Sequence, residues 1–180
     1  NDLTSNLMYM NRQGTFTEDG LLSGAAFSND GAAQAGMGVD AGDFDGDGKD
    51  DIAIFRPSLS QWWQFRSQDG TIGYQFGATG DKTIQGDYTG DGKADVGVFR
   101  PSTGQWLILR SEDSSFFGFP FGTSTDIPSP GDYDGDGQFD AAVFRPSTNT
   151  WFYNGTTSGN VQLNFGAAGD IPIPNVYSVE

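Results

Sequence analysis

The stretch Asp43-Phe44-Asp45-Gly46-Asp47-Gly48-Lys49-Asp50-Asp51 decides the fold class, because it returns twice in the chain. The second copy runs from Asp87 to Asp95 and the third from Asp132 to Asp140. Counted from its first residue, every copy has Asp at positions 1, 5 and 9 and Gly at positions 4 and 6. Position 3 is Asp in the first and third copies and Thr89 in the second. We refer to these segments as loops 1, 2 and 3.

Carboxylates crowded into nine residues indicate a calcium site. Ca²⁺ takes about six to eight oxygen ligands in flexible geometry. Glycine adopts positive φ without steric cost, so a short loop can turn back and bring its side chains together. The alternative is a set of ordinary acidic Asp-Gly turns, but turn chemistry does not require Asp at positions 1, 5 and 9 of all three copies. We therefore expect about three Ca²⁺ ions, one in each loop.

The residues after each loop predict strands rather than the helices of an EF-hand. An EF-hand needs an acid at position 12, where this chain has Ile54, Val98 and Val143. Each loop is followed by a short run rich in β-branched and aromatic residues, which is typical of a strand. The loops are therefore expected to join antiparallel strands of an all-β protein.

Self-similarity extends beyond the loops, with a period of 44 or 45 residues. Phe-Arg-Pro-Ser recurs at Phe55, Phe99 and Phe144, and a Trp follows each Arg by six residues. Such a period is typical of propeller blades. We expect a single domain, a β-propeller-like array of about four four-stranded blades with incomplete terminal blades. The expected boundaries are an incomplete N-terminal blade with an insertion at 1–37, blades at 38–81, 82–126 and 127–170, and a terminal strand at 171–180.

Each repeat is expected to contain four strands, with its aromatic residues packed between blades. Phe55, Trp62 and their copies are expected to pack between blades, with ligand binding as the alternative. Tryptophan is doubled at Trp62-Trp63, and neighbouring strand residues face opposite sides, so one of the two is expected to be exposed as a ligand platform. In the second blade the strands are predicted at Lys82–Gly86, Ala94–Arg100, Gln105–Arg110 and Ser115–Phe121.

The two ends of the chain are incomplete in complementary ways. Residues 9–16 match residues 65–72, but about twelve extra residues precede loop 1, within Ser23–Gly38. This insertion is interpreted as a surface loop or, alternatively, as a contact with another subunit. At the other end, the segment 170–174 copies 126–130, but no fourth loop follows. Half-made terminal repeats leave unpaired strand edges, which soluble proteins usually cover.

These motifs resemble the FG-GAP/VCBS repeat family, the blades of integrin α-subunit propellers and of many bacterial secreted proteins. The resemblance rests on Asp-x-Asp-x-Asp-Gly-x-x-Asp before an apolar strand, on the Phe-Gly pair and on Tyr-x-Asn-x-x-Gly-Thr-Phe near the start. It implies that side chains at positions 1, 3, 5 and 9 and the main-chain carbonyl of position 7 hold Ca²⁺. Because Thr89 replaces a carboxylate, the second site is expected to be the weakest. The implied ligands are Asp43, Asp45, Asp47, Lys49 (main chain) and Asp51; Asp87, Thr89, Asp91, Lys93 (main chain) and Asp95; and Asp132, Asp134, Asp136, Gln138 (main chain) and Asp140.

Composition excludes several classes of function. The formal net charge is −15, which disfavours nucleic acid and anionic membrane surfaces as partners. Without cysteine or histidine the chain has no thiol nucleophile, His-based triad, disulfide or ordinary zinc site. No apolar run is long enough to span a membrane. Exposed calcium sites and a chain that begins with Asn favour a secreted or cell-surface protein, processed or excised from a longer one.

Three hypotheses for function follow. The first is a structural protein that self-assembles head-to-tail into a ring or filament, the C-terminal strand of one subunit completing the N-terminal blade of the next. The second is an adhesion module that binds carbohydrate or a cell-surface protein. An enzyme is the third and is not expected, since the acids outside the loops (Glu18, Asp19, Glu112 and Asp113) are interpreted as solvated turn residues. Asn154-Gly155-Thr156 is a possible glycosylation sequon at Asn154.

Overall fold

The computed structural model describes residues 9–12, 15–18, 39–170 and 172, in two compact units, Asn1–Gly38 and Val39–Glu180. The described part of the first unit is an antiparallel hairpin of β1 (Tyr9–Arg12) and β2 (Thr15–Glu18). Glu18 was expected in a turn; that prediction was wrong, because Glu18 pairs with Tyr9 and ends the second strand. Asp19 and the insertion predicted within Ser23–Gly38 lie outside the described residues.

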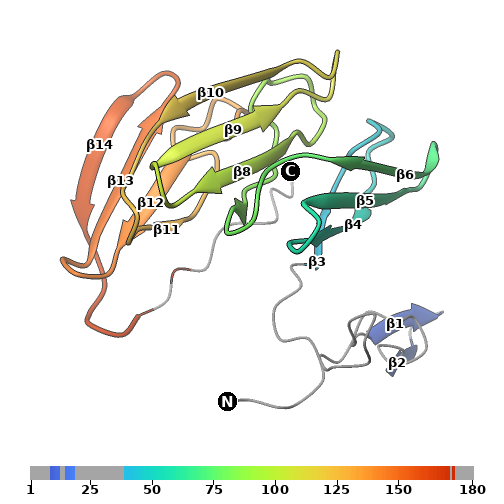
Figure 1. The fold of residues 1–180 in the computed structure, drawn as a ribbon, viewed down its shortest axis with the longest axis horizontal. Helices are drawn as coiled ribbons and strands as arrows, with labels where there is room; N and C mark the ends of the chain where they lie inside the picture. Colours follow the sequence, from blue (N-terminus) through green and yellow to red (C-terminus); the bar gives the residue numbers. More distant parts are fainter. Residues whose placement is uncertain (1–8, 13–14, 19–38, 171, 173–180) are drawn as a thin grey trace. The chain divides into compact units, whose positions relative to one another are not determined.

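The second unit contains three four-stranded antiparallel sheets, each a meander in chain order (Figure 1). The all-β prediction is confirmed for the described residues, which include no helix and hence none able to cross a membrane. Sheet 1 consists of β3 (Val39–Gly42), β4 (Asp51–Arg56), β5 (Gln61–Arg66) and β6 (Gly70–Gln75). Sheet 2 consists of β7 (Lys82–Thr83), β8 (Val96–Arg100), β9 (Gln105–Leu109) and β10 (Phe116–Pro120). Sheet 3 consists of β11 (Ile127–Pro128), β12 (Ala141–Arg145), β13 (Thr150–Gly155) and β14 (Gly159–Asn164).

One sheet lies within each of the predicted segments 38–81, 82–126 and 127–170. The first strand of sheet 2 is shorter than predicted, because regular pairing ends at Thr83. Pairing continues irregularly beyond it through the Ile84 N–H bond to the Gly97 carbonyl and the bridge between Gly86 and Asp95. The terminal strand predicted at 171–180 lies outside the described residues, apart from Pro172.

The core lies between consecutive sheets. We call the face of each sheet that carries Trp62, Trp106 or Trp151 its forward face, and the opposite face its rear face. Apolar residues of the forward face of sheet 1 pack against Val96 and Val98 on the rear face of sheet 2. The forward face of sheet 2 packs in the same way against Ala141 and Val143 of sheet 3. The prediction that the repeated Phe and Trp residues pack between repeats is confirmed at these two junctions.

Two partly buried interactions lie at each junction. The indole N–H of Trp106 donates to the carbonyl of Phe121 at 2.9 Å, and this bond joins the third strand to the Phe-Gly segment that leads to the next sheet. Asp126, at the start of sheet 3, is fully buried and accepts two hydrogen bonds from Arg145 at 2.8 Å. Asp81 and Arg100 form the equivalent pair in sheet 2. In sheets 2 and 3, Phe-Arg-Pro thus ends the second strand beside a buried Asp at the start of the same sheet.

Candidate metal centre

Each loop joins the first and second strands of its sheet, as predicted. The glycines at positions 4 and 6 have φ between 76° and 90° in all three loops. An L-residue with a side chain rarely adopts this conformation, so glycine is required for the turn. The result is a tight loop in which the backbone wraps around the carboxylate of position 1.

The Asp at position 1 holds the loop closed from within. In loop 1, Asp43 Oδ1 accepts from the N–H groups of Gly46 and Asp47, at 2.6 and 3.2 Å, and Oδ2 accepts from Gly48 at 2.8 Å. Asp87 and Asp132 accept the same three bonds in loops 2 and 3. The position-1 carboxylate therefore has a structural role, in addition to any role in binding metal.

The Asp at position 9 is buried and joins the loop to the turn between the third and fourth strands. Asp51 Oδ2 accepts from the Phe44 N–H at 3.0 Å, and Oδ1 accepts from the Ser67 N–H at 2.7 Å. Asp95 and Asp140 make the corresponding bonds. Burial raises the pKa of both Asp95 and Asp140, because the charged form is deprived of water.

Hydroxyl residues of that turn complete the site, and sequence reasoning missed them. The Ser67 hydroxyl donates to Asp47 Oδ2 at 2.7 Å and the Ser111 hydroxyl to Asp91 Oδ2 at 3.0 Å. Thr156 donates to Asp136 in the same way. These three residues recur with the period of the loops, so an alignment of the three repeats gives the signal that could have found them.

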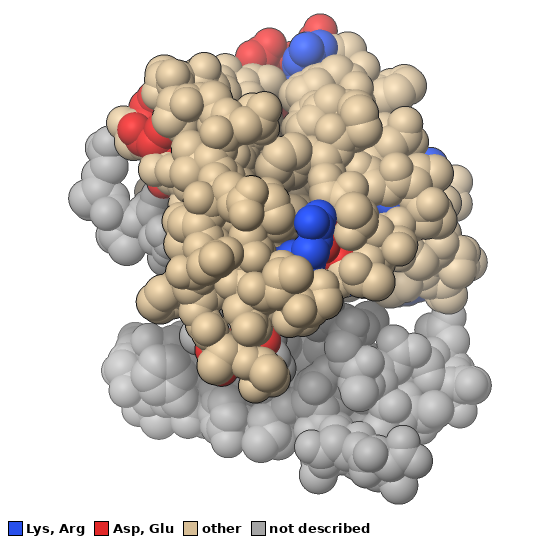
Figure 2. All heavy atoms as spheres, turned by 90° about the vertical axis from the view of Figure 1, so that its left-hand side faces the viewer, with Lys and Arg blue, Asp and Glu red and all other residues tan. Residues whose placement is uncertain are grey.

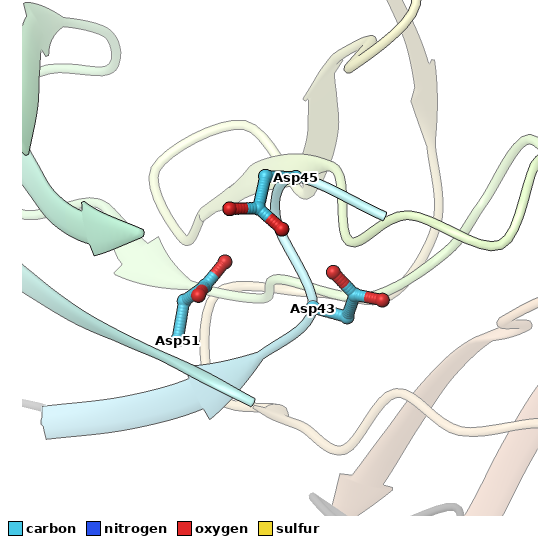
Figure 3. Close-up of side chains that lie close together, drawn as sticks. All are labelled: Asp43, Asp45 and Asp51. Atoms are coloured by element: carbon cyan, nitrogen blue, oxygen red, sulfur yellow. The ribbon is translucent and has the colours of Figure 1, made fainter. Parts of the chain in front are cut away.

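Carboxylates converge in loops 1 and 3. In loop 1, oxygens of Asp43, Asp45 and Asp51 lie within 4.8 Å of one another and turn toward a common point (Figure 3). Asp132, Asp134 and Asp136 form the corresponding group in loop 3. Loop 2, where Thr89 stands at position 3, has no group of three within the described residues. Of the carboxylates expected to be ligands in loops 1 and 3, Asp47 and Asp140 lie outside these groups.

Lysine at position 7 partly offsets the charge of loop 1. Lys49 Nζ lies 2.6 Å from Asp47 Oδ2, and this hydrogen bond is the main cause that lowers the pKa of Asp47. The N–H of Lys49 also donates to Asp47 Oδ1 at 2.9 Å. The same main-chain bond is made by Lys93 in loop 2 and Gln138 in loop 3. These bonds hold the peptide of position 7 beside the carboxylates.

The oxygen atoms at position 3 test whether the loops fit a cation. Asp134 Oδ2 accepts from the N–H groups of Thr157 and Ser158, at 2.8 and 2.9 Å, whereas Oδ1 is buried and lacks a partner among the described residues. The hydroxyl oxygen of Thr89 is likewise buried without a partner. Buried polar atoms are almost always paired, and a hard cation bound by oxygens satisfies such atoms. Both oxygens of Asp45 in loop 1 already accept backbone N–H groups, so this observation favours Ca²⁺ in loops 2 and 3.

The other candidate residues are not brought into these clusters. Trp62 is 2 % exposed and Trp63 is 39 % exposed, so the two side chains do face opposite sides of sheet 1. The Trp63 ring lies over Gly73, where an added Cβ would approach it to 2.8 Å. Asn154 is exposed near the end of β13. Asp113 lies in a turn, as expected; its pKa is lowered mainly by the Ser115 hydroxyl and also by the Ser115 N–H, which donates to Asp113.

Comparison with known families agrees with the geometry of loop 1. Residues 35–72 match the model of the FG-GAP repeat. The chain carries an FG-GAP repeat. The matched segment includes loop 1, β3, β4 and β5, and amounts to about a fifth of the chain. Loops 2 and 3 stand at the same place in sheets of the same topology. No curated protein matches the chain.

Proposed function

We propose that this chain is a calcium-stabilised, non-catalytic structural module that assembles head-to-tail with copies of itself. The observation that carries the calcium part is a pair of buried oxygens at position 3, Thr89 Oγ1 and Asp134 Oδ1, which have no hydrogen-bond partner among the described residues. The convergence of Asp43, Asp45 and Asp51 in the FG-GAP repeat supports it. The ligands would be the side chains at positions 1, 3, 5 and 9 and the carbonyl at position 7.

In this proposal calcium would act as an internal cross-link between two segments of each sheet. Positions 1 and 9 already bind the backbone of the loop and of the turn that follows the third strand, so an ion held between them joins both segments to one point. An ion that binds only the folded loops stabilises the fold by mass action. We therefore expect a chelator to lower the melting temperature. An unchanged melting temperature after exhaustive chelation would refute the calcium assignment.

Two sheet faces that no other sheet covers among the described residues support assembly. On the forward face of sheet 3, Phe165 is 70 % exposed, whereas Phe76 and Phe121, its counterparts in the earlier repeats, pack against the core. The rear face of sheet 1 exposes Trp63 and Phe65, the latter 63 %. Seen from the side of β14, the described surface is mostly uncharged, with acidic groups mainly at its margins and a basic group near its centre (Figure 2). Exposed apolar surface of this kind marks interaction sites.

The forward face of sheet 3 is expected to pack on the rear face of sheet 1 of another copy. A forward face already packs on a rear face twice within the chain, between sheets 1 and 2 and between sheets 2 and 3. A contact between copies in this sense is head-to-tail and gives a ring or a filament. The completion of the N-terminal blade by a C-terminal strand depends on residues outside the described ones, apart from β1 and β2. A propeller-like arrangement of about four blades belongs to the same proposal.

Sedimentation velocity tests the assembly. The protein is measured over a hundred-fold range of concentration, with calcium and with a chelator. We expect a concentration-dependent series of oligomers in calcium that shortens when calcium is removed. A monomer at every concentration in calcium would refute head-to-tail assembly while leaving the calcium sites untouched.

A second candidate function is adhesion through carbohydrate or a cell-surface protein, and the exposed Trp63 favours it. Its ring lies over Gly73 and offers a platform on which a sugar ring could stack. A glycan array probed in calcium with the wild type and with Trp63→Ala distinguishes the two functions. Binding that is lost in Trp63→Ala would favour adhesion, and an array without hits would count against it. A secreted or cell-surface location, where calcium is plentiful, suits either function.

A further inference from the structure

Loops of neighbouring sheets are joined directly to each other. The N–H of Ala94, at position 8 of loop 2, donates to the carbonyl of Asp43, at position 1 of loop 1, at 2.7 Å. Phe139 of loop 3 donates to the carbonyl of Asp87 of loop 2 in the same way, at 2.6 Å. The Lys93 side chain also crosses loop 1 at Gly46, where an added Cβ would lie 2.7 Å from Lys93 Cε. The three loops thus form a connected row.

Each of these bonds is part of a longer chain of peptide groups. The Asp43 carbonyl shares its peptide with the Phe44 N–H, which donates to Asp51 Oδ2 at 3.0 Å. The Ala94 N–H shares its peptide with the carbonyl of Lys93, at position 7. Two peptide groups therefore connect the position-7 carbonyl of loop 2 to the position-9 carboxylate of loop 1.

The same connection recurs between loops 3 and 2. The Asp87 carbonyl shares its peptide with the Tyr88 N–H, which donates to Asp95 Oδ2 at 2.9 Å. The Phe139 N–H shares its peptide with the Gln138 carbonyl. Both connections run from a main-chain ligand of one loop to a buried side-chain ligand of the preceding loop.

We propose that calcium binding is positively coupled between adjacent loops through these peptides, an inference that rests on the proposed calcium sites. The carbonyl and N–H of a trans peptide point in opposite directions, so a Lys93 carbonyl that faces an ion in loop 2 directs the Ala94 N–H toward loop 1. An ion that fixes the Lys93 carbonyl therefore also restrains the Ala94 N–H and, through its hydrogen bond, the Asp43 carbonyl. Ordering of Asp43, Phe44 and Asp51 also lowers the entropy cost of filling loop 1.

The sign of the effect separates this mechanism from simple electrostatics. A dication bound in one loop repels a second dication nearby, so charge alone would make the second ion bind more weakly. The peptide connection predicts tighter binding of the second ion, and the effect must be reciprocal. Among the described residues no hydrogen bond joins loop 1 to loop 3, so that pair is the built-in control.

Three variants that each retain two loops test the coupling. Asp136→Ala leaves loops 1 and 2, Asp47→Ala leaves loops 2 and 3, and Asp91→Ala leaves loops 1 and 3. Position 5 is chosen because its carboxylate accepts a single backbone bond, from position 7, whereas position 1 accepts three and position 9 accepts two. Isothermal titration with calcium is expected to show that the second ion binds at least about five-fold tighter in both adjacent pairs, the low end of typical couplings. Independent binding is expected for loops 1 and 3.

Amide spectra give a second readout that does not depend on the fitted affinities. In Asp47→Ala, where loop 1 lacks a ligand, calcium bound in loop 2 should still shift the Phe44 amide resonance and slow its exchange with solvent. The additional substitution Asp91→Ala should abolish both effects. A Phe44 amide that does not respond in Asp47→Ala would overturn the coupling.

The outcomes separate the coupling from the calcium sites themselves. If the wild type takes up no calcium, the proposed function fails and the coupling fails with it. If the wild type binds calcium but adjacent loops titrate independently or repel, only the coupling is overturned. Equal cooperativity in loops 1 and 3 would also overturn it, since no peptide connection joins those loops.

Discussion

Substitution of Trp106 and Trp151 by alanine measures how much each sheet gains from the sheet that follows it. The two residues occupy the same position of their repeats, in β9 and β13. Trp106 is fully buried, with the rings of Tyr88, Phe99 and Phe119 around it. Trp151 is only half-buried, on the forward face of sheet 3.

The loss of unfolding free energy is expected to be larger for Trp106→Ala than for Trp151→Ala. Trp106→Ala opens a cavity between sheets 2 and 3 and should cost about 3–5 kcal/mol. It also removes the indole donor of the Phe121 carbonyl. Trp151→Ala should cost about 1–2 kcal/mol, because less apolar surface leaves water on folding. Its indole bond to the Phe165 carbonyl is longer, at 3.2 Å, and exposed.

Equilibrium unfolding in urea, followed by circular dichroism at saturating calcium, compares both variants with the wild type. The protein is held at a concentration where sedimentation shows a monomer, and equal m-values are required before the free energies are compared. Equal losses for the two variants in the monomer would refute the assignment of Trp151 to an open face. At concentrations that permit assembly, the loss for Trp151→Ala should rise toward that for Trp106→Ala.

Three further predictions concern single sites. Thr89→Asp supplies the carboxylate that loop 2 lacks. In a protein whose other loops are silenced by Asp47→Ala and Asp136→Ala, this substitution should tighten calcium binding by loop 2 roughly ten-fold relative to Thr89. Titration calorimetry checks this, and an unchanged affinity would argue against position 3 as a ligand. Burial raises the pKa of Asp126, but hydrogen bonds from Arg145 and Thr123 outweigh it, so the net pKa is lowered; the stability that this pair contributes should be complete above about pH 4 and lost as the pH falls through the lowered value. The stability difference between wild type and Asp126→Asn should therefore shrink on acidification, and a pH-independent difference would contradict the ion pair. Gly73→Ala should displace the overlying Trp63 ring toward solvent and shift the tryptophan fluorescence to the red. The same substitution made in a Trp63→Phe background is the control and should give no such shift. The loss of unfolding free energy should stay below about 1.5 kcal/mol, because the ring is free to move outward.

Much of the fold could be predicted from the sequence because its signals are local and repeated. Strand β8 follows from the apolar run after loop 2, and its end follows from Phe-Arg-Pro, where proline cannot donate to a ladder. Because side chains alternate along a strand, the sequence predicted that Trp62 and Trp63 face opposite sides of the sheet. Glu18 was misplaced because strand ends are not marked by a comparable local signal. The candidate ligands were identifiable because their chemistry is confined to nine consecutive residues.

The partners of those ligands could not be predicted, because they come from other parts of the chain. Ser67 contacts Asp47 across a hairpin, and a serine in a turn has no feature that marks it as such a donor. Arg145 belongs to the recurring Phe-Arg-Pro-Ser and Asp126 begins the segment that residues 170–174 copy, but only the pairing of β11 with β12 brings the two together. Thr89 was recognised as a departure from the pattern, while the burial of its hydroxyl needed the folded loop.

The sequence by itself thus determined the all-β class, the period of the repeats and the composition of the three loops. Tertiary structure decided how the loops act on one another. The hydrogen bond from Ala94 to Asp43 joins main-chain atoms, and it exists because the forward face of sheet 1 packs on the rear face of sheet 2. Main-chain bonds leave no trace in residue identity, since every residue other than proline offers the same N–H and carbonyl. The connected row of loops is therefore a property of the packed sheets and not of the motif that builds each loop.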